Sequence, residues 1–280
     1  MSEELKLQVP ETAVVGELEK ALTKSLEKVV NKPFKLKETK DLARMLGMKT
    51  GQQLTWLWKN KCSHYSLRKI PKRSGGSRTL HIPDSSLRAV QYQILNKVLE
   101  KIPCPDYLWA FEKGKSVADM AKIHMNKDVV ISIDLKDYFN RVHVKHITPL
   151  LTSYGIEGLA GRLVAELCTY KFYLPQGGLT SPKLSNLVAG HTFGPKIKEY
   201  CDLLGIDVTI YADDVTLSYN GTKDVSDILG NMARILRENG NFLINDDKTK
   251  VMYSKYRQVV CGVVVNEKPN LARQERNTKE

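Results

Sequence analysis

Two adjacent aspartates, Asp213 and Asp214, interrupt a run of β-branched and aromatic residues, and this feature most constrains the fold. The run VTIYADDVTLSY at residues 208–219 predicts two short strands joined by a tight turn. Two carboxylates at such a turn repel each other unless a cation compensates, and magnesium prefers oxygen ligands of this kind. A second pair, Asp246–Asp247, has the composition of a solvated turn. The Asp213–Asp214 pair alone therefore fits either a metal site or an ordinary surface turn.

A third aspartate, Asp134, ends another apolar strand further upstream. The segment DVVISID at residues 128–134 is β-branched and short, which predicts a strand. If this strand is a neighbour of the hairpin, three carboxylates meet and suit two metal ions about 3.5–4 Å apart. Such ions would activate an attacking hydroxyl and bind a departing pyrophosphate. A turn residue at the end of a strand is the alternative interpretation of Asp134.

The charge balance predicts a polyanionic partner. The chain has 280 residues, with 43 Lys and Arg against 31 Asp and Glu, a net charge of +12. No acidic residue occurs between Leu42 and Pro83. Within this basic stretch, residues 66–83 predict a hairpin whose turn is at residues 74–77, with Lys72 and Arg78 near its tip. Cations at the tip of a hairpin suit a polyphosphate, although a basic surface loop is the alternative.

Composition excludes several classes of protein. Apolar residues are 42% and charged residues 26% of the chain, which excludes collagen-like, disordered and disulfide-scaffold classes. The five cysteines form no zinc-binding pattern, and neither a signal peptide nor a membrane span is evident. We therefore expect a cytoplasmic protein that does not contact the membrane.

Helical spacing predicts further elements around these strands. We expect helices at residues 11–31, 84–101, 183–204 and 223–239, with a kink at Pro195 in the third. The order of strand, helix, hairpin, helix and strand resembles a split βαβ unit, which indicates an α+β fold with a ferredoxin-like sheet.

Five motifs in order resemble those of reverse transcriptases, and the resemblance covers residues 65–265. In chain order they are the first palm motif (Asp134–Phe139), the PQGxxxSP loop (Pro175–Pro182), the YxDD box (Tyr211–Asp214), a lysine-containing motif (Leu243–Thr249) and a primer-grip hairpin (Val260–Gly262).

The resemblance implies a right-hand polymerase fold. Residues 39–125 would form fingers of mixed helices and a hairpin, with residues 143–172 also fingers-like. Residues 126–265 would form the palm, which carries the YADD hairpin and the primer grip. Residues 1–38 would be an N-terminal helical segment, and residues 266–280 the start of a thumb that is absent or truncated.

The resemblance also implies roles for individual residues. Asp134, Asp213 and Asp214 would be catalytic and, with Leu135, would hold two Mg²⁺ ions, for which Mn²⁺ could substitute. Phe139 would pack under the incoming sugar and exclude a 2′-hydroxyl. The implied nucleotide-binding residues are Lys72, Arg78, Asp137, Tyr138, Phe139, Gln176, Gly177 and Lys248. The implied primer and template residues are Tyr211, Ser181, Pro182, Cys261 and Gly262.

Among reverse transcriptases the chain most resembles the bacterial retron enzymes, because of LPQGGLTSPKLSN at residues 174–186. It departs from them at Met120–His124, which lacks the Asn of their Asn-Ala-x-x-His motif, and at Cys261, where they favour Thr. The resemblance implies RNA-directed DNA synthesis from dNTPs, with a structured noncoding RNA as template and primer and cDNA as product. It also implies antiphage defence with an effector protein.

Three alternatives stay open at this point. The first is another prokaryotic defence reverse transcriptase that is protein-primed or untemplated. The second is an RNA-binding scaffold with a weakly active polymerase fold. The third is a DNA-binding regulator built on the helical residues 39–60, which leaves the palm motifs unexplained.

Overall fold

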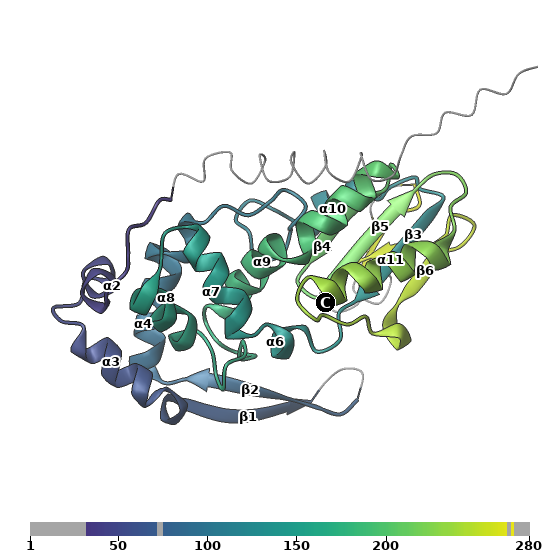
Figure 1. The fold of residues 1–280 in the computed structure, drawn as a ribbon. Coiled ribbons are helices and arrows are strands. Elements are labelled where there is room, and N and C mark those ends of the chain that lie inside the picture. The colour runs from purple at the N-terminus through teal and green to yellow at the C-terminus, as the bar shows by residue number, and fades with distance from the viewer. Residues whose placement is uncertain (1–31, 72–74, 268–269, 272–280) are drawn as a thin grey trace, which may run out of the picture.

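The computed structural model describes residues 32–71, 75–267 and 270–271 (Figure 1). The helix expected at residues 11–31 and the site residue Lys72 lie outside the described residues. Most of the segments assigned to an N-terminal helical region and to a thumb lie outside them as well.

A four-stranded antiparallel sheet forms the centre of the molecule. Its strands are β3 (Val129–Asp134), β4 (Asp207–Tyr211), β5 (Asp214–Tyr219) and β6 (Lys250–Tyr253). They are arranged in the order β4-β5-β3-β6. Helices separate β3 from β4 and β5 from β6, so the sheet has the expected βαββαβ connection. This confirms the α+β fold predicted from the order of the elements.

Alternating side chains of β3 place hydrophobic cores on both faces of this sheet. Ile131 and Ile133 belong to the large core, whereas Val130 packs with Met120 of α5 and with Val260. The helices α10 (Phe193–Leu203) and α11 (Val225–Glu238) contact each other and lie over the sheet in Figure 1. The opposite core includes α5 (Val117–Ile123) and a small sheet. That sheet consists of β7 (Val259–Val260), β8 (Val263–Val264) and β9 (Asn270–Leu271).

The basic stretch forms the predicted hairpin. Strands β1 (Tyr65–Pro71) and β2 (Ser77–Pro83) pair from Tyr65↔Pro83 to Pro71↔Ser77. Gly75 and Gly76 both have left-handed backbones in the connecting turn, with φ of 88° and 77°. The hairpin lies apart from the central sheet, along one side of the molecule in Figure 1.

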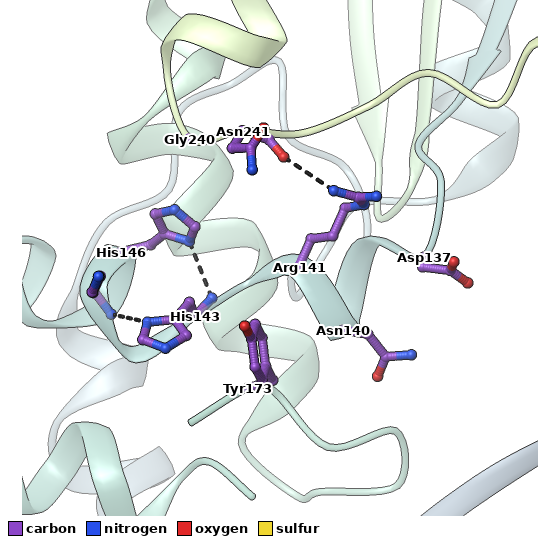
Figure 2. Close-up of a pocket in the computed structure, with 9 residues that line it drawn as sticks. Asp137, Asn140, Arg141, His143, His146, Tyr173, Gly240 and Asn241 are labelled. Carbon is purple, nitrogen blue, oxygen red and sulfur yellow. Dashed lines mark hydrogen bonds between the residues drawn. The ribbon is translucent and has the colours of Figure 1, made fainter. Parts of the chain in front are cut away.

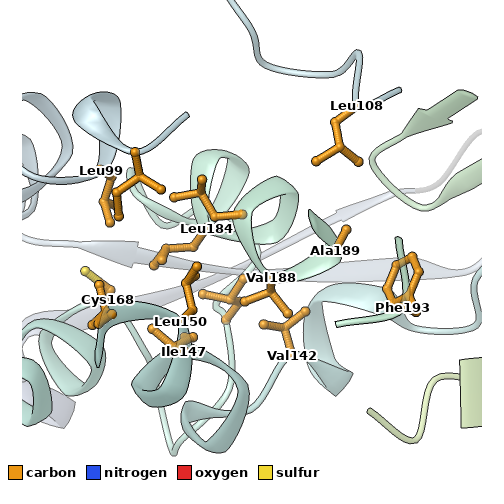
Figure 3. Close-up of a cluster of buried hydrophobic side chains, with 14 of the residues drawn as sticks. Leu99, Leu108, Val142, Ile147, Leu150, Cys168, Leu184, Val188, Ala189 and Phe193 are labelled. Carbon is orange, nitrogen blue, oxygen red and sulfur yellow. The ribbon is translucent and has the colours of Figure 1, made fainter. Parts of the chain in front are cut away.

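Short helices fill the space between the hairpin and the sheet. Leu99, Ile147, Leu184 and Val188 are among the buried side chains that pack their faces together in Figure 3. The α-helices are α2 (Thr39–Leu46), α3 (Gln52–Lys59), α4 (Ser85–Lys97), α6 (Tyr138–Arg141), α7 (Val144–Ser153), α8 (Gly158–Leu167) and α9 (Ser181–His191). The 3-10 turns are η1 (Lys61–His64), η2 (Leu99–Lys101) and η3 (Asp246–Lys248).

The predicted kink at Pro195 is wrong in its position. The structure breaks the predicted helix at Thr192, whose φ of −108° and ψ of −97° separate α9 from α10. Pro195 is the third residue of α10. The first-turn backbone has no intrahelical acceptor for its N–H groups, so a proline there breaks no hydrogen bond. Within the part of the chain that the structure describes, no helix is long and apolar enough to cross a membrane.

Candidate active site

The three predicted aspartates lie at one end of the central sheet. Asp134 of β3 is the direct cross-strand partner of Asp214 of β5, so the two side chains are on the same face. Asp213 lies in the turn between β4 and β5, next to Ala212, whose φ is 56°. The Leu135 N–H donates to the Asp213 carbonyl at 2.7 Å, which ties the end of β3 to this turn. Sheet topology therefore gathers carboxylates that are far apart in the sequence.

The carboxylates of this turn are half-buried and repel one another. Burial raises the pKa of Asp214 to about 6, and the charges of Asp213 and Asp134 contribute to the increase. Burial also raises the pKa of Asp213, while attraction to Lys248 and Arg78 opposes the increase. Ionising both carboxylates of the turn is therefore unfavourable unless a further cation compensates their charge.

Lys248 and Asn245 contact the third carboxylate. The Lys248 ammonium lies 3.0 Å from Asp134 Oδ2 and 3.1 Å from Oδ1, and this hydrogen bonding raises the lysine's pKa. Asn245 Nδ2 donates to Asp134 Oδ1 at 2.9 Å, and its backbone N–H donates to the Asp134 carbonyl. Sequence reasoning did not select Asn245, although it belongs to the same motif as Lys248.

The chemistry of these side chains fits a divalent cation. Among the described residues, no three His, Cys, Asp or Glu side chains converge closely enough to ligate one ion. Asp134 is instead engaged by the Lys248 ammonium. The donor set still suits a hard cation, because its oxygen ligands repel one another and a divalent ion would relieve that repulsion. Leu135 has a buried, purely hydrocarbon side chain without a ligating atom, so only its backbone carbonyl could join this set.

The first palm motif places neighbouring aromatic rings in different environments. Tyr138 is 2% exposed, and its hydroxyl donates to the Ser185 carbonyl at 2.7 Å. Its ring packs against Phe193 and Phe242, so its side chain is part of the core. Phe139 is half-buried, with its ring 6.0 Å from that of Tyr138. Asp137 is exposed and has a left-handed backbone, with φ of 52°.

The PQG loop (Pro175–Pro182) is hydrogen-bonded to strand β2 of the basic hairpin and leads into α9. The His81 N–H of β2 donates to the Gln176 carbonyl at 2.7 Å. Gly177 follows with φ of 99°, and a Cβ there would lie 3.3 Å from the His81 carbonyl oxygen. Ser181 is buried and donates to the Pro175 carbonyl at 2.8 Å, which closes the loop, and the half-buried Pro182 follows it in α9.

Residues predicted to contact the primer and template lie around the aspartate turn. Tyr211 of β4 is half-buried, and its ring centroid is 6.5 Å from that of the exposed Phe111. Cys261 and Gly262 form the turn between β7 and β8, with φ of 46° and 84°. Burial raises the pKa of Cys261 to about 12, and Cys261 packs against the same small core as Tyr211, which precedes the aspartate turn. The positive charge of the exposed Arg78 guanidinium opposes the rise in the pKa of Asp213 that burial causes.

His124, at the departure from the retron motif, is fully buried. Its Nδ1 lies 2.8 Å from Ser218 Oγ and its Nε2 lies 2.8 Å from Thr209 Oγ1. These partners are on β5 and β4, so the ring attaches the end of α5 to the sheet. From the sequence, His124 could either pack inside the protein or contact RNA, and its buried position shows that it packs inside the protein.

Comparison with known proteins shows one family. The family model described as reverse transcriptase (RNA-dependent DNA polymerase) matches residues 70–275. The retron Ec86 reverse transcriptase of Escherichia coli is 31% identical over 68% of this chain and 59% of its own length. The retron Mx162 reverse transcriptase of Myxococcus xanthus is 30% identical over 80% of this chain and 52% of its own length. The chain thus spans between half and two thirds of the length of these relatives.

Solved structures show the same fold at lower identity. A Candida tropicalis apo telomerase truncated from its C-terminal domain aligns with a TM-score of 0.54 and 12% identity. The alignment covers 78% of this chain and 59% of that one. A Candida albicans telomerase in complex with a telomeric RNA fragment also aligns with a TM-score of 0.54, covering 74% of this chain and 46% of that one. At such identity these matches support the right-hand polymerase fold alone.

Proposed function

Because the chain belongs to the reverse transcriptase family, we propose that it is an RNA-directed DNA polymerase. It would add dNTPs to a primer hydroxyl by phosphoryl transfer. The observation that carries the proposal is the placement of Asp134, Asp213 and Asp214 at one end of the sheet, with Lys248 hydrogen-bonded to Asp134. The three aspartates and Lys248 occupy motifs that resemble those of the family.

Reverse transcriptases use divalent metal ions, and we propose two Mg²⁺ ions here, with Mn²⁺ as a substitute. Asp134, Asp213, Asp214 and the Leu135 carbonyl would hold them. When bound, the ions would activate the primer hydroxyl and neutralise the pyrophosphate. Arg78 and Lys248 would bind the triphosphate, with Lys72 as a further cation from the hairpin, since both side-chain types bind phosphate strongly. Phe139 would lie beneath the sugar and exclude ribonucleotides.

Further residues would contact the incoming nucleotide and the primer–template duplex. Gln176 and Gly177 would line the nucleotide pocket, because the left-handed glycine brings the backbone close to β2. Tyr211 and the Cys261–Gly262 turn would support the primer end. Asp137 and Tyr138 would contribute backbone groups to nucleotide binding, since the Tyr138 side chain is in the core.

The likeness to retron reverse transcriptases supports the partners that we propose. These are a structured noncoding RNA as template and primer, dNTPs as substrates and cDNA as product. We further propose that the protein acts in antiphage defence together with an effector protein. The five free cysteines fit a reducing compartment such as the cytoplasm.

Primer extension on an RNA template with dNTPs and Mg²⁺ tests the activity. We expect Asp213→Asn with Asp214→Asn to abolish extension while leaving RNA binding largely intact. The matched control is Asp106→Asn with Asp202→Asn, which removes the same two charges from exposed residues outside the five motifs. Equal loss of extension in both variants, or equal loss of RNA binding and extension in the first, would contradict the catalytic assignment.

A further inference from the structure

A polar hollow of about 680 Å³ adjoins the candidate active site. Residues from α6, the start of α7, the loop before the PQG motif and the segment after α11 line it (Figure 2). This volume is in the range of sites that hold small molecules. Among the described residues that line the hollow, Asp137 alone belongs to the predicted nucleotide-binding set. The hollow therefore shares one predicted nucleotide-binding residue with the candidate active site, and none of the three aspartates lines it.

The charge of the lining favours an anion. Arg141 and Lys145 contribute two cations, and Asp137 is the one acidic residue among the described lining residues. The Arg141 guanidinium is already oriented, because Nε donates to the Lys136 carbonyl at 3.0 Å and Nη1 to the Asn241 carbonyl at 3.4 Å. A guanidinium has five N–H donors, so donors remain after these two contacts. Arginine of this kind suits phosphate recognition.

An aromatic surface lies beside these cations. Tyr173 is 43% exposed, and its ring lies 4.8 Å from that of His143 at an interplanar angle of 78°. Backbone hydrogen bonds in both directions between Tyr170 and Tyr173 hold the loop, and the Val144 N–H donates to the Phe172 carbonyl. The ring is therefore presented by an ordered backbone. Exposed aromatic rings next to cations are typical of sites that stack nucleic-acid bases.

The backbone around the hollow is shaped by strained residues from separate segments. Asp137, Phe172 and Asn241 all have left-handed backbones, with φ of 52°, 72° and 57°. Such conformations are uncommon for residues other than glycine and cluster at ligand sites. His143 and His146 add rigidity, because the Nδ1 of each accepts a backbone N–H at the start of α7.

We propose that this hollow is a second nucleotide-binding site, in which Arg141 and Lys145 hold phosphates and Tyr173 stacks on the base. Asn140 and Asn241 would offer amide groups to the edge of the base. A free nucleotide and an unpaired nucleotide of a bound RNA share this chemistry. The proposal goes beyond the polymerase function and does not depend on it.

Calorimetric titration in EDTA tests the site without the metal-dependent catalytic centre. The probes are ADP, which carries a base, and pyrophosphate, which does not. We expect Tyr173→Leu to weaken ADP binding roughly tenfold and to leave pyrophosphate binding unchanged, since stacking involves only the base. Lys145→Gln should weaken the binding of both probes several-fold. The matched controls Tyr256→Leu and Lys101→Gln alter exposed residues elsewhere and should change neither.

Unchanged ADP affinity in both variants of the hollow would overturn the proposal. Competition with a short single-stranded RNA then distinguishes the sources. Displacement of ADP identifies a nucleotide of the RNA strand as the ligand, and failure to displace it identifies a free nucleotide. If a variant does not fold, crosslinking of 8-azido-ADP to the wild-type protein replaces it. Labelling of the peptide that contains Tyr173 supports the site, and labelling confined to other peptides refutes it.

Discussion

At the scale of single residues, Tyr138 and Phe139 are adjacent aromatic residues that serve different purposes. Tyr138 is buried and hydrogen-bonded to the Ser185 carbonyl, so it fixes the backbone after β3. Phe139 packs on the edge of that fixed ring and stays half-buried. A side chain supported in this way can act as a rigid steric barrier.

We predict that Phe139→Ala admits ribonucleotides. Removing the ring opens space for a 2′-hydroxyl, and discrimination between dNTPs and NTPs should fall by roughly tenfold or more. The measurement is kcat/KM for a matched dNTP and NTP pair in primer extension. Unchanged discrimination, with the variant still folded, would remove Phe139 from this role.

The sequence predicted which residues belong to the candidate site better than it predicted how each one is buried or hydrogen-bonded. Motif spacing singled out Asp134, Asp213 and Asp214, and the structure places all three at one end of the sheet. The sequence could not show that Ser181 closes its own loop through the Pro175 carbonyl. It also could not show that Asn245 reaches Asp134, because that contact depends on where the chain returns after α11.

At the scale of elements, His124 attaches α5 to the sheet. One ring nitrogen donates and the other accepts when the imidazole is neutral, which suits the two hydroxyls of Thr209 and Ser218. Burial lowers the pKa of His124 to about 4, from an ordinary value near 6.5. In the unfolded chain the histidine takes up its proton at higher pH than in the folded protein.

We predict that the folded state loses about 2 kcal/mol of stability between pH 7 and pH 5 through this group. The unfolded state binds more protons in this interval, so the loss begins as pH falls through about 6.5 and ends near pH 4. Urea denaturation at both pH values measures it. His124→Gln cannot titrate, so its stability should change less over the same interval. An equal change in both proteins would show that other groups account for it.

The elements themselves followed from local chemistry where the signal was strong. The β-branched runs and the Gly75–Gly76 turn predicted the strands and the hairpin correctly. The break at Thr192 was not predictable from proline alone, because Pro195 is accommodated in the first turn of α10. The two helices pack against different elements, α9 against α7 and η2 and α10 against α11 and β4, which a single straight helix would not reach.

At the scale of the whole molecule, one backbone contact links the basic hairpin to the PQG loop. The His81 N–H of β2 donates to the Gln176 carbonyl, next to the left-handed Gly177. This contact holds the hairpin, which carries Arg68 and Lys69 on β1 and Arg78 on β2, against the loop. The contact itself is not predictable from the sequence, although Gln176 belongs to the predicted site, because it depends on the packing of the intervening helices.

The exposed cations of this hairpin should set the salt dependence of RNA binding. Arg68 and Lys69 of β1 are both exposed, in a stretch without acidic residues. Replacing both with Gln should lower the slope of log K against log salt concentration by about 0.7 for each phosphate of single-stranded RNA that the variant no longer neutralises. Fluorescence anisotropy at several salt concentrations measures the slope.

As a control, Arg234→Gln with Arg237→Gln removes the same charge from exposed positions of α11. If net charge alone governs binding, the slope will decrease equally in both variants. If the hairpin binds the RNA backbone, it will decrease only in the first.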